Sequence, residues 1–312
     1  MKYILSVLLG AMSYGILSTI VVKAYGEGYG LGEVVGSQLL VGFLLSWSLA
    51  FYMRRRSSKR ESASSRTSKP VGRLTWKQRF MLMAAGMPTA VTGLLYYHSL
   101  RYIPNSLAII LLFQFTWMGV LLHAISQRKR PNAIMLLTLA VLFGGTLLAA
   151  GIMEQGVSRF NIIGIVLGLL AAVSYTMFIL FSGKAVPSVH PAIRSSWMIT
   201  GGLILVFILF PPTFLLNGLL LGKLLLFGLL LGLFGAFIPP VLFAIGVPHI
   251  GEGMAGILGA SELPVAVLLS SSVLHEQVSF LQWAGVGLVL IGVALPELTK
   301  KSGIRMNHHA SM

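Results

Sequence analysis

The stretch GMAGILGASELPVAVLLSSSVL, residues 253–274, decides the class of fold. It is long enough to cross the hydrocarbon core of a bilayer as one helix, and Glu262 is the only charged residue in it. A charge at the centre of a membrane helix costs about 2.5–3.5 kcal/mol on insertion scales, so such a residue is by default a functional candidate. The alternative is a structural hydrogen-bonding group that stays protonated.

The rest of the chain has the composition of a membrane protein. Hydrophobic residues make up 56% of its 312 residues, charged residues make up only 10%, and the mean hydropathy is +0.86. The chain has no Cys and no Asp, and all eight acidic residues are Glu. Disulfides, iron–sulfur clusters and thiolate zinc sites are therefore excluded, and we expect no metal and no cofactor.

Apolar segments of spanning length follow one another with little sequence between them, which leaves no room for a soluble domain. Lys2 precedes the first segment as in a secretory signal, but the length of the segment and the lack of a small-residue cleavage site favour a retained span. The sequence therefore predicts an all-α, polytopic membrane protein with ten transmembrane helices. The expected spans are 3–22, 34–53, 80–99, 106–125, 133–152, 162–181, 192–210, 224–247, 253–274 and 281–295.

Basic residues are divided unevenly between the two faces that these spans define. Of the 23 basic residues, 19 fall on one face, and the four on the other are Lys23, Arg101, Arg159 and Lys223. Basic residues accumulate on the cytoplasmic side of membrane proteins. We therefore expect both termini in the cytoplasm and the protein in the plasma or inner membrane.

The loop at residues 54–79 holds ten of these basic residues and a single aromatic residue, Trp76. A basic segment beside membrane spans is attracted to anionic lipid headgroups by about 1 kcal/mol per basic residue. Nucleic-acid binding to single strands uses interleaved aromatic residues on a binding fold, and neither is present here. The loop therefore predicts contact with anionic membrane lipids and no nucleic-acid partner.

An internal repeat relates the two halves of the chain. The pair Ser13-Tyr14 in the first span recurs as Ser174-Tyr175 in the sixth, and later parts of the halves align weakly but in order. Five spans per half is an odd number, so the second half enters the membrane from the opposite side, as in alternating-access transporters. The predicted units are a first five-span repeat at 1–152, a second inverted repeat at 160–297 and a cytoplasmic tail at 298–312.

The last two spans carry the most specific sequence features. These are LPV at 263–265, LQWAG at 281–285 and IGV at 291–293. They resemble the ten-span EamA-type transporters of the drug/metabolite transporter superfamily, and the resemblance covers nearly the whole chain. It implies a central cavity between the two halves, lined by the first, third, fourth, sixth, eighth and ninth spans. The first half departs from the pattern, because Thr116-Trp117 stands where a Pro is expected.

Candidate site residues follow from depth in the membrane. Glu262 lies about 13 Å into its span, near the midplane where repeat transporters bind substrates. A dehydrated carboxylic acid there can load and release a proton, so we expect Glu262 to couple transport to protons. In the first half of the chain, Gln114 lies within one residue of the position that corresponds to Glu262 in the repeat. Further substrate-binding candidates, whose rings also suit packing, are Tyr14, Tyr96, Tyr97, Trp117 and Tyr175, and the expected helix breaks are Pro88, Pro239, Pro240 and Pro264.

Two nucleotide-binding motifs are matched only in part. Residues 251–256, GEGMAG, fit the dinucleotide fingerprint but open an apolar span with no strand before them. Residues 218–223 resemble a P-loop, yet they have three intervening residues instead of four, and Leu224 replaces the required Ser or Thr. Neither motif supports ATP-driven transport.

The sequence predicts a proton-coupled secondary transporter that exports amino acids or related neutral or cationic solutes. No Lys or Arg lies deep in a span, which disfavours strongly anionic substrates. A sugar or metabolite uptake carrier that tolerates loss of Glu262 stays open. A membrane-embedded enzyme built on His275 and Glu276 is the weaker alternative, and we expect no enzyme. Whether the chain forms a homodimer is also left open.

Overall fold

The computed structural model describes residues 1–63, 74–103, 105–128, 133–149, 161–275 and 278–309. The described residues form helices and no strands, so the chain is all-α as predicted. The first half contains α1 (Lys2–Tyr14), α2 (Leu17–Gly26), α3 (Leu31–Ala63), α4 (Trp76–Ser99), α5 (Asn105–Phe113), α6 (Phe115–Gln127) and α7 (Ala133–Ala149). The second half contains α9 (Ile162–Lys184), α10 (Pro191–Leu209), α11 (Lys223–Leu231), the π-helix η3 (Gly232–Phe237), α12 (Ile238–Ile250), α13 (Glu252–Gly259), α14 (Glu262–Val273) and α15 (Phe280–His309), with short 3-10 turns η1 (Thr213–Leu215) and η2 (Leu219–Leu221).

The chain is a multi-pass membrane protein. Seven segments of the described residues are long and apolar enough to cross a bilayer: Lys2–Gly26, Leu31–Arg55, Trp76–Ser99, Ile162–Lys184, Pro191–Leu209, Lys223–Ile250 and Glu252–Val273. Two shorter apolar helices, Ala133–Ala149 and Phe280–Leu295, coincide with two further predicted spans. The remaining predicted span, 106–125, is the pair α5 and α6. The observed helices therefore agree closely with the ten predicted spans.

Two helices extend beyond their predicted ends. The sequence analysis placed a loop from Arg54 onward, but α3 continues as a helix to Ala63, and α15 continues through the predicted tail to His309. Arg, Lys, Glu and Ala are good helix formers, so a helix that leaves the membrane is propagated by these residues in water. The rest of the basic loop at 64–73 and the predicted boundary between the repeats at 152–160 lie outside the described residues.

The start of α4 is fixed by a capping box. The Thr75 side chain accepts a hydrogen bond from the Gln78 backbone N–H at 3.3 Å, and the Gln78 side chain accepts one from the Thr75 backbone N–H at 3.0 Å. Two backbone donors of the first turn are thereby satisfied. This explains why the helix begins at Trp76 and not at the predicted Phe80.

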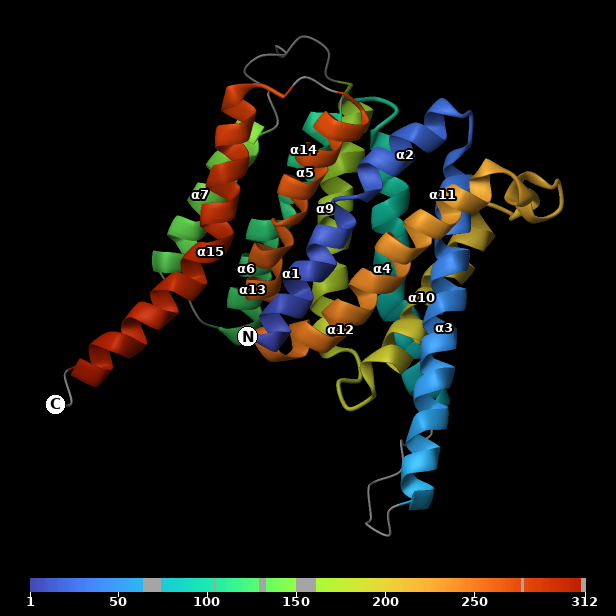
Figure 1. Ribbon diagram of the computed structural model, residues 1–312, viewed down its shortest axis with the longest axis horizontal. Helices are drawn as coiled ribbons and strands as arrows, with labels where there is room; N and C mark the ends of the chain where they lie inside the picture. The colour runs from blue at the N-terminus through green and yellow to red at the C-terminus, as the bar shows by residue number, and fades with distance from the viewer. Residues whose placement is uncertain (64–73, 104, 129–132, 150–160, 276–277, 310–312) are drawn as a thin grey trace.

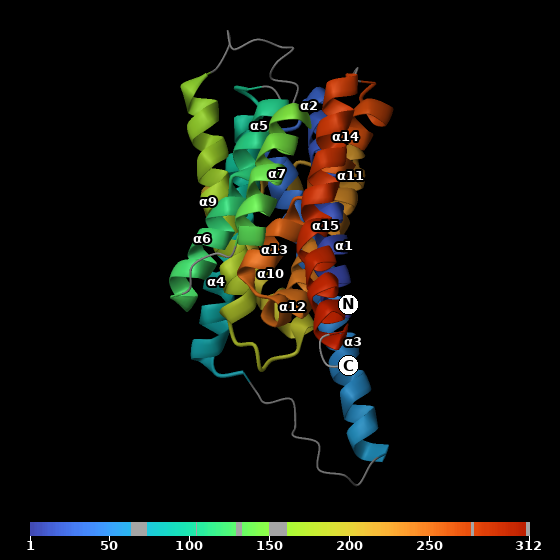
Figure 2. The ribbon, with the colours of Figure 1, turned by 90° about the vertical axis from the view of Figure 1, so that its left-hand side faces the viewer.

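Small residues allow the closest helix crossings. α15 packs along α7 where Gly145 and Gly285 meet, and a Cβ atom added at Gly145 would lie 2.9 Å from the Val289 backbone nitrogen. α4 crosses α10 where Gly86 and Gly201 each meet the other helix's backbone. Lipid supplies no hydrophobic force between helices, so close backbone approach is a main source of their association. Figures 1 and 2 show α7 and α15 side by side at one edge of the bundle.

The remaining helices surround the middle of the bundle. In Figure 1, α1 and α2 rise from the end of the bundle where the chain begins, and α9 descends towards that end. The start of α1 and the end of α15 lie towards the same end, which we call the N-terminal end. α1, α4, α9 and α12 pack on one another and position the site.

Candidate functional site

A narrow cavity of about 60 Å³ lies within the bundle. Its walls come from α1, α2, α3, α4, α5, α9, η3 and α14, so both halves of the chain contribute. Most of the lining is apolar, and among the described residues Glu262 is the only Asp, Glu, Lys, Arg or His side chain in it. A largely apolar cavity with few polar groups is the usual form of a small-molecule site.

Glu262 is the first residue of α14, directly after an interruption in the span. Pro264 has no N–H to donate to the Ala260 carbonyl, which instead accepts the Leu263 N–H at 3.2 Å. Ala260 and Ser261 are held by similar short-range bonds and separate α13 from α14. The interruption expected at Pro264 is thus present, and it places the carboxyl group at a helix N-terminus, where the helix dipole favours negative charge.

Three other spans are interrupted near the cavity. α1 and α2 are separated at Gly15 and Ile16, and α5 and α6 are separated at Gln114. The span at 223–250 passes through the π-helix η3. Irregular backbone inside a membrane occurs where it lines a cavity or is buried in protein. These interruptions therefore mark the same region as Glu262.

The expected proline breaks are met in part. α12 begins with Pro239 and Pro240 in its first turn, immediately after η3. α4 runs unbroken through Pro88, so the expected break is absent there. The Pro88 carbonyl accepts hydrogen bonds from the Thr92 and Ser174 hydroxyls, both at 2.8 Å. The missing Pro88 N–H instead affects the carbonyl of Ala84, four residues earlier, so these two bonds are additional contacts of the Pro88 carbonyl.

Four of the predicted tyrosines lie around Glu262. Tyr14, Tyr96, Tyr97 and Tyr175 all line the cavity, and each is close enough to interact electrostatically with the Glu262 carboxyl. The rings of Tyr14 and Tyr175 meet edge to face, with centroids 5.6 Å apart. Their hydroxyl groups are buried and have no hydrogen-bond partner among the described residues.

Gln38 is a cavity residue that the sequence analysis missed. Its side-chain oxygen accepts a hydrogen bond from the Tyr97 hydroxyl at 3.1 Å, and both residues are buried. The Tyr97 carbonyl accepts a further bond from the Tyr25 hydroxyl at 3.1 Å. The available signal was a lone amide near the start of the second span, where a polar side chain is costly in lipid.

Two predicted site residues lie elsewhere. Gln114 and Trp117 are not part of the cavity lining, and the Trp117 indole N–H donates to the Gln114 side chain at 2.9 Å. Trp117 is 42% exposed on the outside of the bundle. The two residues are three apart on neighbouring turns, so they share one face of the helix and meet each other.

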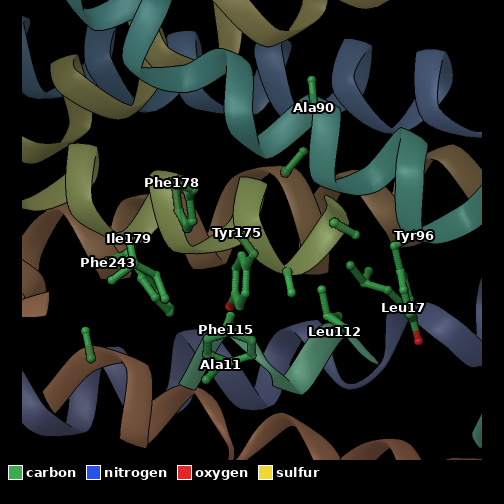
Figure 3. Close-up of a cluster of buried hydrophobic side chains, with 14 of the residues drawn as sticks. Ala11, Leu17, Ala90, Tyr96, Leu112, Phe115, Tyr175, Phe178, Ile179 and Phe243 are labelled. Atoms are coloured by element: carbon green, nitrogen blue, oxygen red, sulfur yellow. The ribbon is translucent and has the colours of Figure 1, made fainter. Parts of the chain in front are cut away.

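An aromatic layer closes the cavity towards the N-terminal end. Phe115, Phe178 and Phe243 are fully buried, and none of them lines the cavity. The Tyr175 ring lies 4.5 Å from that of Phe115 and 5.9 Å from that of Phe178, and Phe178 and Phe243 are 5.5 Å apart. Figure 3 shows these rings gathered on one side, with Leu17, Leu112 and Tyr96 on the other. We call Phe115, Tyr175, Phe178 and Phe243 the aromatic layer.

Charged side chains near the site are engaged away from the cavity. Lys184 on α9 pairs with the buried Glu252 of α13 at 3.8 Å. Arg194 is 1% exposed, and it donates to the Ala244 carbonyl at 3.1 Å and to the Ser182 carbonyl. Arg194 lies in the first turn of α10 and is enclosed by protein.

Comparison with known proteins agrees with this geometry. Residues 162–296 match the EamA-like transporter family. The second half of the chain is therefore similar to an EamA-like transporter domain. The match includes the sequence features from which the resemblance to EamA-type transporters was predicted, and it confirms that prediction.

Two further similarities extend beyond the EamA-like domain. The chain is 25% identical over 224 residues to an uncharacterized transporter of Synechocystis sp., which covers 70% of this chain and 67% of the relative. A crystal structure of a protein with 15% sequence identity superposes with a TM-score of 0.71, covering 95% of this chain and 98% of that one. The first relative is named as a transporter, and the second similarity shows the fold alone.

Proposed function

We propose that the protein is a proton-coupled secondary transporter of small neutral or cationic metabolites, amino acids among them, and that it works as an exporter. The observation that carries this proposal is the position of Glu262: the one carboxyl group among the described residues of a cavity formed by both halves, at the interruption of a membrane span. Transporters bind substrates and coupling ions at such interrupted helices.

Corresponding hydrogen bonds support a relation between two inverted repeats. The Ser13 hydroxyl donates to the Phe234 carbonyl of η3 at 2.6 Å, and the Ser174 hydroxyl donates to the Pro88 carbonyl of α4 at 2.8 Å. Each serine precedes a cavity tyrosine and binds a span of the opposite half. In this proposal the two halves, 1–152 and 160–297, rock against each other around the cavity, as inverted repeats do in alternating access.

The aromatic layer indicates which state of the alternating-access cycle the described conformation represents. In this proposal it separates the cavity from the N-terminal end, which we expect on the cytoplasmic side from the distribution of basic residues. The described conformation would then be closed to the cytoplasm, and opening of the layer would admit substrate for export across the plasma or inner membrane. The lipid partner proposed for the basic segment at 54–79 would lie on the same side.

Flux in proteoliposomes tests the proposal. We would load vesicles with radiolabelled phenylalanine or 2-phenylethylamine, impose a pH gradient and compare the wild type with Glu262→Gln, using Glu33→Gln at the start of α3 as the matched control. We expect gradient-driven flux in the wild type and in Glu33→Gln and its loss in Glu262→Gln. Unchanged coupling in Glu262→Gln would refute the proton role, and sugar counterflow independent of Glu262 would favour the uptake carrier.

A further inference from the structure

We infer that the cavity selects an organic cation: a protonated amine on an apolar or aromatic body that carries no carboxylate. The inference rests on the proposed transport function and narrows its substrate class. It follows from the charges in the cavity, from the rings around Glu262 and from the helix end on which Glu262 lies.

The charge balance of the cavity calls for a cation. The Glu262 side chain makes no hydrogen bond or ion pair with another described residue, and no Lys, Arg or His is among the described residues that line the cavity. Two cations of the same half are engaged elsewhere: the buried Arg194 contacts backbone carbonyls, and Lys184, whose side chain is 48% exposed, pairs with Glu252. An ionised carboxylate in a dehydrated site needs a counter-charge, and the described lining supplies none, so a bound cation would stabilise the ionised form while protonation neutralises the group when the ligand is absent.

The rings around Glu262 suit an ammonium group. Tyr14, Tyr96, Tyr97 and Tyr175 surround one carboxyl group, and aromatic faces attract cations, most strongly where water is excluded. The buried hydroxyls of Tyr14 and Tyr175 lack partners, so an ammonium N–H would supply the hydrogen bonds that they miss.

The apolar part of the lining suits the body of the ligand. Leu39, Ile109, Leu112 and Phe113 line the cavity next to the tyrosines. A hydrocarbon or aromatic body would bury its surface there, while a strongly hydrated body such as a sugar would lose hydrogen bonds to water. The cavity therefore combines one anionic point with an apolar wall.

A substrate carboxylate finds no basic partner among the described residues of this cavity. Its usual partners in membrane transporters are a basic side chain or the N–H groups of a broken helix. The helix end of α14 already carries the Glu262 carboxyl group, and the only polar side chain that the start of α2 adds to the lining is the uncharged Ser18 hydroxyl. Pro264 removes one N–H from the first turn of that helix. An amino acid would place a second negative charge beside the first, which is unfavourable.

Three compounds that differ by one group each test the inference. The set is 2-phenylethylamine, phenylalanine and 3-phenylpropanoate, and a second set with an alkyl body is pentylamine, norleucine and hexanoate. Binding to the purified protein in detergent is measured by titration calorimetry. We expect each amine to bind at least tenfold more tightly than its amino acid, and the carboxylates not to bind. Equal or tighter binding of the amino acid, or no saturable amine binding in either set, overturns the inference.

Variants assign the binding to Glu262. We expect Glu262→Gln to weaken amine binding at least tenfold, while Glu252→Gln, a buried glutamate outside the cavity, leaves it unchanged. Because no gradient exists in detergent, this experiment separates the two proposals. Selective amine binding without proton-driven flux would leave the substrate class standing and refute the coupling. Proton-driven flux with a preference for phenylalanine would support the coupling and refute the substrate class.

Discussion

Gly15 packs directly against the backbone carbonyl of Glu262. A Cβ atom added at Gly15 would collide with that oxygen and would lie 2.7 Å from the Val265 Cβ atom. The interruption between α1 and α2 therefore packs against the start of α14, and the two halves of the chain are in contact at Glu262. The φ angle of Gly15 is negative, so any residue could adopt its backbone conformation. Glycine is needed here only because the two backbones approach so closely.

Replacement of Gly15 by Ala should displace the start of α14. Overpacking of a well-packed contact costs about 1–3 kcal/mol, and the atoms that must move belong to Glu262 and Val265. We expect a lower thermal unfolding temperature and several-fold weaker amine binding. The control is Gly287→Ala on α15, where nothing lies within 4 Å of the added atom, so stability should stay equal or rise. If both variants behave alike, the Gly15 contact does not position Glu262.

Truncation of the aromatic layer should open the cavity to the N-terminal end. The chain has no native Cys, so a Thr92→Cys variant, at a cavity-lining position, reports access without background. Adding Phe178→Ala removes a fully buried ring between the cavity and that end. We expect a membrane-impermeant thiol reagent applied from that side to react at least several-fold faster than with Thr92→Cys alone.

Two control measurements distinguish opening of the aromatic layer from a general loss of stability. Loss of a buried ring destabilises proteins by about 3–5 kcal/mol, so the unfolding temperature must be recorded beside the labelling rate. Phe207→Ala removes a ring that pairs with Phe214, outside the aromatic layer, and should not change the rate. Equal acceleration by Phe207→Ala would mean that general loosening, not the layer, controls access.

Arg194→Lys should destabilise the second half of the chain despite keeping the charge. The guanidinium reaches carbonyls on two helices, Ser182 of α9 and Ala244 of α12, and a single ammonium group cannot reproduce that fork. A buried acceptor left without its donor costs about 1–3 kcal/mol. Thermal unfolding in detergent measures the loss, and Arg101→Lys at an exposed position should have little effect. A fully stable Arg194→Lys variant would contradict this role.

Much of the fold could be predicted because lipid imposes simple rules. Apolar length located the spans, and Pro264 located the interruption before Glu262, since a missing N–H has a local consequence. The interruption at Gly15 carries no proline, and it arises from packing against Glu262, which is distant in sequence. The π-helix at 232–237 likewise depends on tertiary contacts, among them the bond from Ser13.

The position of a candidate residue along its span could be predicted, but not the face of the helix on which it lies. The Gln114 side chain, which does not line the cavity, contacts Trp117. Tyr14 and Tyr175 were found because the repeat marks both, and each faces the cavity. To predict Gln38 as a cavity residue, one would have to know which side of α3 faces Tyr97.

Acidification should weaken the start of α10 through His190. This residue precedes the helix, and its Nδ1 atom accepts the Ala192 backbone N–H at 3.3 Å. Burial lowers the pKa of His190 from its ordinary value of 6.5. The unfolded chain therefore binds the proton more readily, so the stability that this cap contributes is fully present above about pH 6.5 and is lost as the pH falls through the folded-state pKa. Protonation also turns the Nδ1 acceptor into a donor.

Two substitutions separate the hydrogen bond by which His190 caps α10 from the protonation of its side chain. Asn at position 190 keeps a side-chain acceptor for the helix and carries no titrating group, so His190→Asn should reduce the loss of thermal stability between pH 7.5 and pH 5. His190→Ala removes the cap and should cost about 1 kcal/mol at the higher pH, with a smaller further loss on acidification. Unfolding temperatures of the three proteins across this range provide the comparison. An unchanged pH dependence in His190→Asn would show that His190 does not set the acid sensitivity of α10.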